Sequence, residues 1–180
     1  MRIVSGFLKG RRFEMPSSKW KTRPTTDHAK ESLFNILHNW IELEDITVLD
    51  LFSGTGNLAY EFASRGANKV VCVEQFGACV RYIQQNVKAF KLDEIVEIRR
   101  QDVFKFLGQH QQQYDVIFAD PPYDSPKFSL IPQLVEQQAL LKAEGLLIIE
   151  HDARQNFESN PNFIEMRQYG QSYFSFIKAN

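Results

Sequence analysis

Short apolar strand patterns alternate with amphipathic helix patterns along most of this chain, and this alternation restricts the possible folds more than any other feature. The predicted strands are Thr47–Phe52, Lys69–Glu74, Ile95–Arg99, Asp115–Asp120, Gly145–Glu150, Asn162–Tyr169 and Ser172–Lys178. The predicted helices between them are Asn57–Ser64, Phe76–Phe90, Val103–Leu107 and Leu130–Gln138. Such alternation is typical of a doubly wound α/β protein. We expect a Rossmann-like, mostly parallel sheet that ends in a C-terminal antiparallel hairpin.

A further helix precedes the first strand. Ala29, Leu33, Leu37 and Trp40 recur at steps of three and four residues, which predicts an amphipathic helix. Thr26 is suited to cap its first turn, because a threonine hydroxyl can accept a hydrogen bond from a backbone N–H there.

The first 30 residues are strongly basic. They hold eight Lys and Arg side chains against two acidic ones, a net charge of +6, whereas the other 150 residues hold 13 basic and 20 acidic side chains, a net charge of −7. The apolar segments Ile3-Val4, Phe7-Leu8 and Phe13–Met15 flank Lys9-Gly10, which predicts a small β-hairpin. We expect residues 1–25 to form a basic arm that contacts phosphates, in front of a main domain over residues 26–180. A solvated terminus without such a role is the alternative.

Length and composition limit the class of protein. A chain of 180 residues with 43 % apolar and 24 % charged residues is typical of one globular domain. No apolar run approaches the roughly 18 residues of a membrane span, and the N-terminus lacks the apolar core of a signal peptide, so we expect a cytoplasmic protein. Cys72 and Cys79 lie in apolar patterns and are expected in the core.

Carboxylates follow four successive predicted strands. Asp50 precedes the glycine-rich turn Gly54-Thr55-Gly56, Glu74 ends the second strand, and Asp102 and Asp120 follow the third and fourth. The carboxyl ends of parallel strands meet at one edge of a sheet, where ligands bind. Glu74 is placed to bind ribose hydroxyls. The sequence therefore predicts a nucleoside site at this edge.

Asp50 indicates which ligand this site prefers. Its carboxylate stands four residues before Gly54, where it would repel the pyrophosphate of a dinucleotide. S-adenosylmethionine has an ammonium group, a sulfonium centre and a ribose diol, but no phosphate. It fits the carboxylates better than NAD does, which disfavours an oxidoreductase.

The segment Asp120-Pro121-Pro122-Tyr123 directly follows the apolar run Val116–Ala119. Proline cannot donate to a sheet ladder, so the pair ends the strand in a stiff loop. Such a loop suits a planar amino group. The carboxylate and the free carbonyls can accept hydrogen bonds from its N–H groups, and the aromatic ring can stack on its face. Alternatively, the prolines only terminate the strand and Tyr123 packs nearby.

Several motifs together resemble the RsmD family of class I S-adenosylmethionine-dependent methyltransferases. The motifs are Arg2-Ile3-Val4-Ser5-Gly6, Arg23-Pro24-Thr25-Thr26-Asp27, Leu33-Phe34-Asn35-Ile36-Leu37, Asp50-Leu51-Phe52-Ser53-Gly54-Thr55-Gly56, Ser64-Arg65-Gly66-Ala67, Asp120-Pro121-Pro122-Tyr123 and Glu150-His151. The resemblance runs to Tyr169-Gly170 and implies methylation of one guanine N2 in bacterial 16S ribosomal RNA, with S-adenosylhomocysteine as product. The chain departs from the family pattern at Gln75-Phe76, where charged residues are common, and at His28, where arginine is usual.

These motifs assign candidate site residues. The expected catalytic residues are Asp120, Pro121, Pro122 and Tyr123. The expected cofactor-binding residues are Asp50, Phe52, Ser53, Gly54, Gly56, Glu74, Gln75, Asp102, Val103 and Asp120. The expected RNA-binding residues are Arg2, Lys9, Arg11, Arg12, Lys21, Arg23 and Thr25. The expected partner is ribosomal RNA in the small subunit or an assembly intermediate, bound by a monomer.

The expected chemistry is direct in-line methyl transfer. The Asp120 carboxylate and the Pro121 carbonyl would accept the two N–H bonds of the guanine amino group, which lets its nitrogen pyramidalise towards the methyl group. Tyr123 would stack on a base turned out of its helix or loop. No metal is expected, because the histidines are scattered; His151 either lines the pocket or is a hydrogen-bonded structural residue.

Other functions share part of this pattern. A DNA or RNA adenine-N6 methyltransferase uses a similar loop but normally needs additional surface to read bases. A protein-glutamine methyltransferase typically carries asparagine at the position of Asp120. A nucleotide-binding module without catalysis is the alternative from another class.

Overall fold

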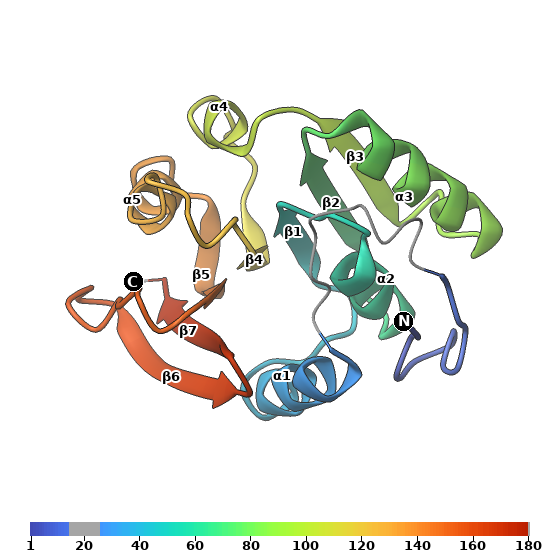
Figure 1. The fold of residues 1–180 in the computed structure, drawn as a ribbon, viewed down its shortest axis with the longest axis horizontal. Helices are drawn as coiled ribbons and strands as arrows, with labels where there is room; N and C mark the ends of the chain where they lie inside the picture. The colour runs from blue at the N-terminus through green and yellow to red at the C-terminus, as the bar shows by residue number, and fades with distance from the viewer. Residues whose placement is uncertain (15–25, 180) are drawn as a thin grey trace.

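The computed structural model describes residues 1–14 and 26–179 (Figure 1). Its helices are α1 (Asp27–Trp40), α2 (Asn57–Ser64), α3 (Gly77–Ala89), α4 (Val103–Leu107) and α5 (Leu130–Gln137). Its strands are β1 (Thr47–Leu51), β2 (Lys69–Glu74), β3 (Val96–Arg100), β4 (Tyr114–Ala119), β5 (Leu141–His151), β6 (Phe163–Tyr169) and β7 (Ser172–Lys178). None of the described helices is both long and apolar enough to cross a bilayer.

The strands form one sheet in the order β3-β2-β1-β4-β5-β7-β6. Strands β1 to β5 are mutually parallel, whereas β7 runs antiparallel between β5 and the edge strand β6. The predicted doubly wound sheet with a C-terminal antiparallel hairpin is therefore confirmed. The chain moves outward from β1 in one direction and from β4 in the other, so the ends of these two strands flank the point where ligands bind in such sheets.

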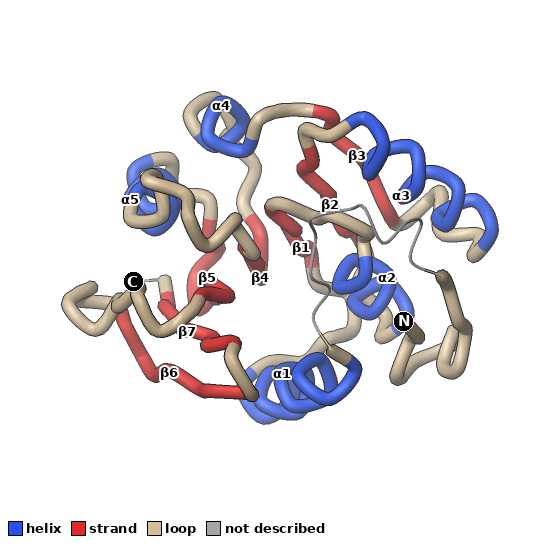
Figure 2. The backbone as a smooth tube through the Cα atoms, viewed as in Figure 1, coloured by secondary structure: helices blue, strands red, loops and turns tan. Residues whose placement is uncertain are grey.

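Helices cover both faces of the sheet (Figure 2). One hydrophobic core joins the sheet to α1, α2 and α3. In this core the Phe34 and Phe62 rings pack edge to face, with their centroids 4.7 Å apart. The other core joins the sheet to α4 and α5 through residues such as Ile117 and Ile131. Both cysteines are buried, as predicted. The Thr26 hydroxyl accepts a hydrogen bond from the Ala29 N–H at 3.2 Å, which confirms the predicted helix cap.

Residues 1–14 form a small hairpin with an antiparallel bridge between Arg2 and Arg12. The hairpin packs against α2, because the Glu61 carboxylate accepts hydrogen bonds from the N–H groups of Val4 at 2.8 Å and Ser5 at 3.0 Å. The predicted N-terminal hairpin is thus confirmed. The predicted RNA-binding residues Lys21, Arg23 and Thr25 lie outside the described residues.

The fifth strand is longer than its apolar pattern predicted. It begins at Leu141 instead of Gly145, and its register with β4 shifts between the pairs Tyr114–Leu141 and Val116–Leu146. Glu144 lies in this irregular stretch with a positive φ of 64°. Because this stretch includes charged residues, the apolar pattern did not detect the first part of the strand.

Candidate active site

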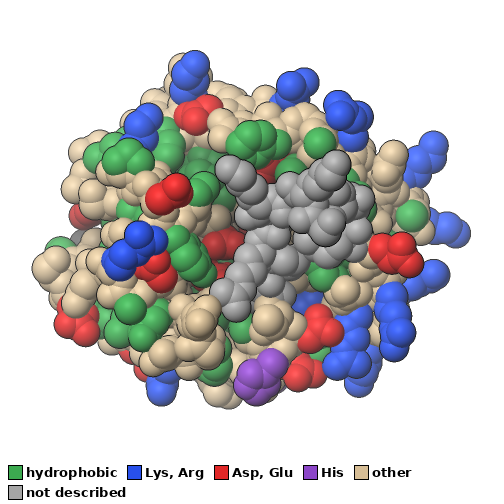
Figure 3. All heavy atoms as spheres, viewed as in Figure 1, with side chains coloured by type: hydrophobic (Ala, Val, Ile, Leu, Met, Phe, Trp, Pro, Cys, Tyr) green, Lys and Arg blue, Asp and Glu red, His purple; other side chains and the backbone are tan. Residues whose placement is uncertain are grey.

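A cavity of about 590 Å³ opens at the carboxyl ends of the parallel strands. Its volume falls within the roughly 300–1,000 Å³ of small-molecule sites. The ends of β1, β2 and β4 and the segments that follow β1 to β5 line the cavity with Asp50, Phe52, Ser53, Gly54, Thr55, Asn57, Leu58, Glu74, Gln75, Phe76, Asp102, Val103, Phe118, Asp120, Pro121, Pro122, Tyr123, Asp124 and Arg154. Figure 3 shows acidic side chains near the centre of the face, whereas Lys and Arg side chains gather around its periphery.

This cavity brings together all the predicted cofactor-binding and catalytic residues except Gly56. Gly56 instead allows the turn into α2, where it adopts a φ of +76° that favours glycine. A Cβ atom at this position would lie 2.7 Å from the Tyr60 hydroxyl oxygen. Gly56 therefore shapes the loop without lining the cavity.

The Glu74 carboxylate connects the loops after β1 and β2. One oxygen accepts the Gly54 N–H at 2.9 Å and the other accepts the Phe76 N–H at 2.8 Å. A carboxylate has about four acceptor positions, so two remain for further donors. Glu74 can thus fix the glycine-rich loop and still accept hydrogen bonds from ribose hydroxyls.

Asp50 carries a buried carboxylate oxygen that has no hydrogen-bond partner among the described residues. Burial, together with repulsion from Glu74, raises the pKa of Asp50 from 3.8 to about 7. A buried acceptor without a partner is unfavourable unless a ligand supplies a donor. A cationic donor such as an ammonium group would fill this place, so Asp50 fits the charged end of S-adenosylmethionine.

Phe76 and Asp102 line the cavity in the segments that follow β2 and β3. Asp102 accepts the Lys105 N–H at 3.0 Å and so caps α4. Phe76 leaves 60 % of its surface exposed beside Gln75. An exposed aromatic side chain of this kind suits contact with an adenine ring.

The Asp120–Tyr123 loop follows β4 directly. Burial raises the pKa of Asp120 well above its usual range, and the negative charges of Glu150 and Asp50 raise it further. The Tyr123 hydroxyl lies 3.5 Å from a Glu150 carboxylate oxygen and 3.3 Å from the Ser172 hydroxyl oxygen. The aromatic ring is therefore held from β5 and β7 while it lines the cavity.

Arg154 lines the same cavity and was not predicted. It follows the end of β5 at His151, but no motif in the sequence distinguishes it from the neighbouring loop residues. One of its Nη2–H bonds is donated to the Tyr123 carbonyl oxygen at 3.1 Å, and its Nε–H is donated to Asp152 at 2.7 Å.

His151 does not line the cavity. It is fully buried, with its ring nitrogens 2.8 Å from the Asp152 carbonyl oxygen and 2.7 Å from the Ser175 hydroxyl oxygen. Of the two alternatives, the structural role is the one observed. In the described part of the chain, no three His, Cys, Asp or Glu side chains are arranged to hold a metal ion.

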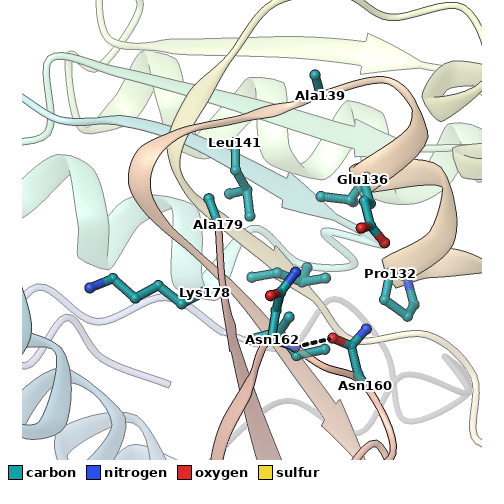
Figure 4. Close-up of a pocket in the computed structure, with 11 residues that line it drawn as sticks. Pro132, Glu136, Ala139, Leu141, Asn160, Asn162, Lys178 and Ala179 are labelled. Atoms are coloured by element: carbon teal, nitrogen blue, oxygen red, sulfur yellow. Dashed lines mark hydrogen bonds between the residues drawn. The ribbon is translucent and has the colours of Figure 1, made fainter.

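A second cavity of about 200 Å³ lies at the other end of β5, between α5 and the end of β7 (Figure 4). Asn160 and Asn162 border it, and the Asn162 N–H donates to the Asn160 side-chain oxygen at 2.9 Å. None of the predicted site residues lines it.

The described basic residues of the N-terminal hairpin are exposed. They are Arg2, Lys9, Arg11 and Arg12. Lys30 links this hairpin to the cavity, because its ammonium group donates to the Arg2 carbonyl and, at 2.9 Å, to the side-chain oxygen of Asn57. Asn57 itself lines the cavity.

Comparisons with known proteins agree with this geometry. The family model described as "Conserved hypothetical protein 95" matches residues 1–178. Ribosomal RNA small subunit methyltransferase D of Haemophilus influenzae is 34 % identical over 156 residues, which cover 83 % of this chain and 78 % of that protein. YlbH of Bacillus subtilis, a candidate rRNA methyltransferase, is 32 % identical over 155 residues, 84 % of this chain and 83 % of its own length.

A solved structure shows the same fold over nearly the whole chain. The Escherichia coli protein yhhF, a candidate methyltransferase, superposes with a TM-score of 0.86 at 26 % identity, covering 99 % of this chain and 97 % of that one. The sheet order, the position of the cavity at the strand ends and the family match all support the same family assignment. The chain belongs to the RsmD family of methyltransferases.

Proposed function

We propose that this protein transfers a methyl group from S-adenosylmethionine to the N2 amino group of a guanine in 16S ribosomal RNA of the small subunit. One observation carries the proposal. A single cavity is lined both by Asp50 and Glu74, which are expected to bind the cofactor, and by Asp120 and Tyr123, which are expected to bind the target base. Cofactor and target base would therefore occupy the same cavity. The H. influenzae relative supports ribosomal RNA as the substrate.

When bound, S-adenosylmethionine supplies a methyl group on a positively charged sulfur. Glu74 would accept hydrogen bonds from its ribose, and the unpaired oxygen of Asp50 would bind its ammonium group. The cofactor-binding set comprises Asp50, Phe52, Ser53, Gly54, Glu74, Gln75, Asp102, Val103 and Asp120, with Gly56 shaping the loop.

Asp120 and the Pro121 carbonyl would hold the two N–H bonds of the guanine amino group, while Tyr123 stacks on the flipped base. The raised pKa of Asp120 makes its carboxylate a stronger proton acceptor once it is ionised. The positive charge of the cofactor favours that ionised form. As the new C–N bond forms and the C–S bond breaks, Asp120 stabilises the positive charge on nitrogen and can take its proton.

The basic arm would bind RNA phosphates through Arg2, Lys9, Arg11 and Arg12, together with Lys21, Arg23 and Thr25. Phosphate contacts of this kind position a substrate without reading its sequence. A target chosen by shape suits a folded RNA or ribonucleoprotein.

The test uses small ribosomal subunits from cells that lack the enzyme. Incubation with labelled S-adenosylmethionine should produce N2-methylguanosine, identified by mass spectrometry, and Asp120→Ala should abolish it. Asp93→Ala removes an exposed carboxylate that does not line the cavity and should retain activity. N6-methyladenosine would establish the adenine alternative, whereas no incorporation into particles or extracted RNA would refute a ribosomal substrate.

A further inference from the structure

Arg154 is the one Lys or Arg among the described residues that line the cavity. The other charged lining residues are acidic: Asp50, Glu74, Asp102, Asp120 and Asp124. Such a cavity suits a cationic cofactor but repels the phosphates that accompany a nucleotide of RNA. Arg154 is therefore the lining residue whose charge favours a phosphate.

The donors of Arg154 are only partly used. Its Nε–H and Nη2 atoms bind Asp152 and the Tyr123 carbonyl. Its Nη1 atom makes no hydrogen bond with the described residues, which leaves two N–H donors available. The side chain is 63 % exposed, so these donors are accessible.

The contacts of Arg154 also fix its position relative to the target base. The bond to the Tyr123 carbonyl ties the guanidinium to the loop whose ring is expected to stack on that base. The Asp152 carboxylate also binds the guanidinium, through Nε and Nη2. The Nη1 donors of such a guanidinium suit a phosphate oxygen, because a hydrogen bond between two charged groups is stronger than one between neutral groups.

We propose that Arg154 binds a backbone phosphate next to the flipped nucleotide while it holds the loop that carries Tyr123. This inference rests on the proposed function, because it assumes an RNA substrate in the same cavity. It makes Arg154 a substrate-binding residue that distinguishes a polynucleotide from a free nucleoside or an uncharged amide.

Arg154→Ala is the decisive variant, and Arg167→Ala is its matched control. Arg167 also pairs with an acidic residue two positions earlier, Glu165, and is similarly exposed, but it lies on β6 outside the cavity. With unmodified small subunits, Arg154→Ala should raise KM roughly 10-fold, the effect expected for one charged hydrogen-bond contact. It should also reduce the slope of log KM against log salt concentration by about 0.7, the value for one phosphate contact.

Two further measurements separate phosphate binding from a structural role. Arg154→Lys keeps the charge and should retain the salt slope, whereas the melting-temperature increase caused by S-adenosylmethionine should be unchanged in every variant. If Arg154 only holds the loop, Arg154→Ala will lower kcat and leave the salt slope as in the wild type. That result would overturn the inference without affecting the proposed function.

The inference can also be tested if no methyl transfer to the small subunit is detected. Binding of 16S ribosomal RNA is measured by filter retention with S-adenosylhomocysteine present, over a series of salt concentrations. A smaller salt slope for Arg154→Ala than for wild type and Arg167→Ala supports the phosphate contact even if the methylated nucleoside is a different one. Equal slopes contradict it.

Discussion

Lys30 and Glu61 form an ion pair of 3.2 Å in which both side chains are completely buried. Burial lowers the pKa of Lys30, and the charge of Glu61 opposes this shift. Glu61 also binds Arg65 at 2.9 Å and two backbone N–H groups of the hairpin. The pair thus joins α1, α2 and the N-terminal hairpin in one buried network.

Removing one partner of this pair should strongly destabilise the protein. Lys30→Met leaves the Glu61 charge in the core without its ammonium partner, and loss of one member of a buried pair costs about 3–5 kcal/mol. Denaturant unfolding of the ligand-free protein measures this loss. The control is Lys178→Met, which breaks the exposed pair with Glu144 and should change the unfolding free energy by at most about 1 kcal/mol. Equal effects of the two substitutions would contradict a structural role for the buried pair.

Asp50→Asn should stabilise the ligand-free protein at alkaline pH. Because the folded-state pKa of Asp50, about 7, lies above its usual 3.8, the stability it contributes is present below pH 4 and is lost as pH rises to 7. Asparagine does not ionise, so the variant does not lose this stability as the pH rises. The unfolding free energy of the variant should exceed that of the wild type at pH 8 by up to about 4 kcal/mol, at about 1.4 kcal/mol per pKa unit.

The same substitution should remove cofactor binding. S-adenosylmethionine should raise the melting temperature of the wild type but not that of Asp50→Asn. Asp93→Asn, at an exposed position, serves as control for both measurements. A variant that binds the cofactor normally, or whose stability difference from the wild type is the same at pH 5 and pH 8, would refute this role of Asp50.

The sequence predicted the fold and most of the cavity because both depend on local patterns. The bounds of α2, β2, α4 and β7 follow from apolar periodicity, and Glu74 and Asp120 lie at strand ends, where a parallel sheet concentrates them. No such pattern identifies Lys30 and Glu61. Charged residues in amphipathic helices are normally assigned to solvent, and only the packing of two distant helices under the hairpin buries them.

Arg154 could not be assigned for a related reason. Its place in the cavity depends on the path of the chain after β5, which turns back towards the loop at Tyr123. The route of a loop depends on tertiary contacts such as the one between Arg154 and the Tyr123 carbonyl rather than on periodicity. The apolar pattern also missed the start of β5, where polar residues occupy an irregular part of the strand.

Glu150→Gln should shift the pH dependence of methyl transfer to lower pH. The buried Glu150 carboxylate raises the pKa of Asp120, so its neutralisation should let Asp120 ionise at lower pH. The amide oxygen of glutamine can still face the Tyr123 hydroxyl. The acid limb of the kcat/KM profile reports this ionisation in the free enzyme.

The matched control is Glu144→Gln, on the same strand but outside the cavity. Its acid limb should coincide with that of the wild type. If the Glu150→Gln profile also coincides with the wild type, Asp120 does not control the pH dependence of the reaction.

Gly6→Ala should separate RNA binding from cofactor binding. Gly6 has a φ of +79°, and a Cβ atom there would lie 1.7 Å from the backbone oxygen of Ser64 in α2. The hairpin would have to move away from α2, which displaces its basic side chains. We expect the KM for small subunits to rise at least about 10-fold, by analogy with the loss of one or more charged contacts. The melting-temperature increase caused by S-adenosylmethionine should persist.

Gly10→Ala is a control with the same backbone requirement. Gly10 has a φ of +84°, but a Cβ atom there would meet nothing within 4 Å. Both variants place alanine in a left-handed conformation, which costs about 1–2 kcal/mol at either position. Only Gly6→Ala adds the collision with α2. A large KM effect for Gly6→Ala and a small one for Gly10→Ala would therefore assign RNA binding to the docked position of the hairpin, whereas equal effects would attribute the change to backbone strain alone.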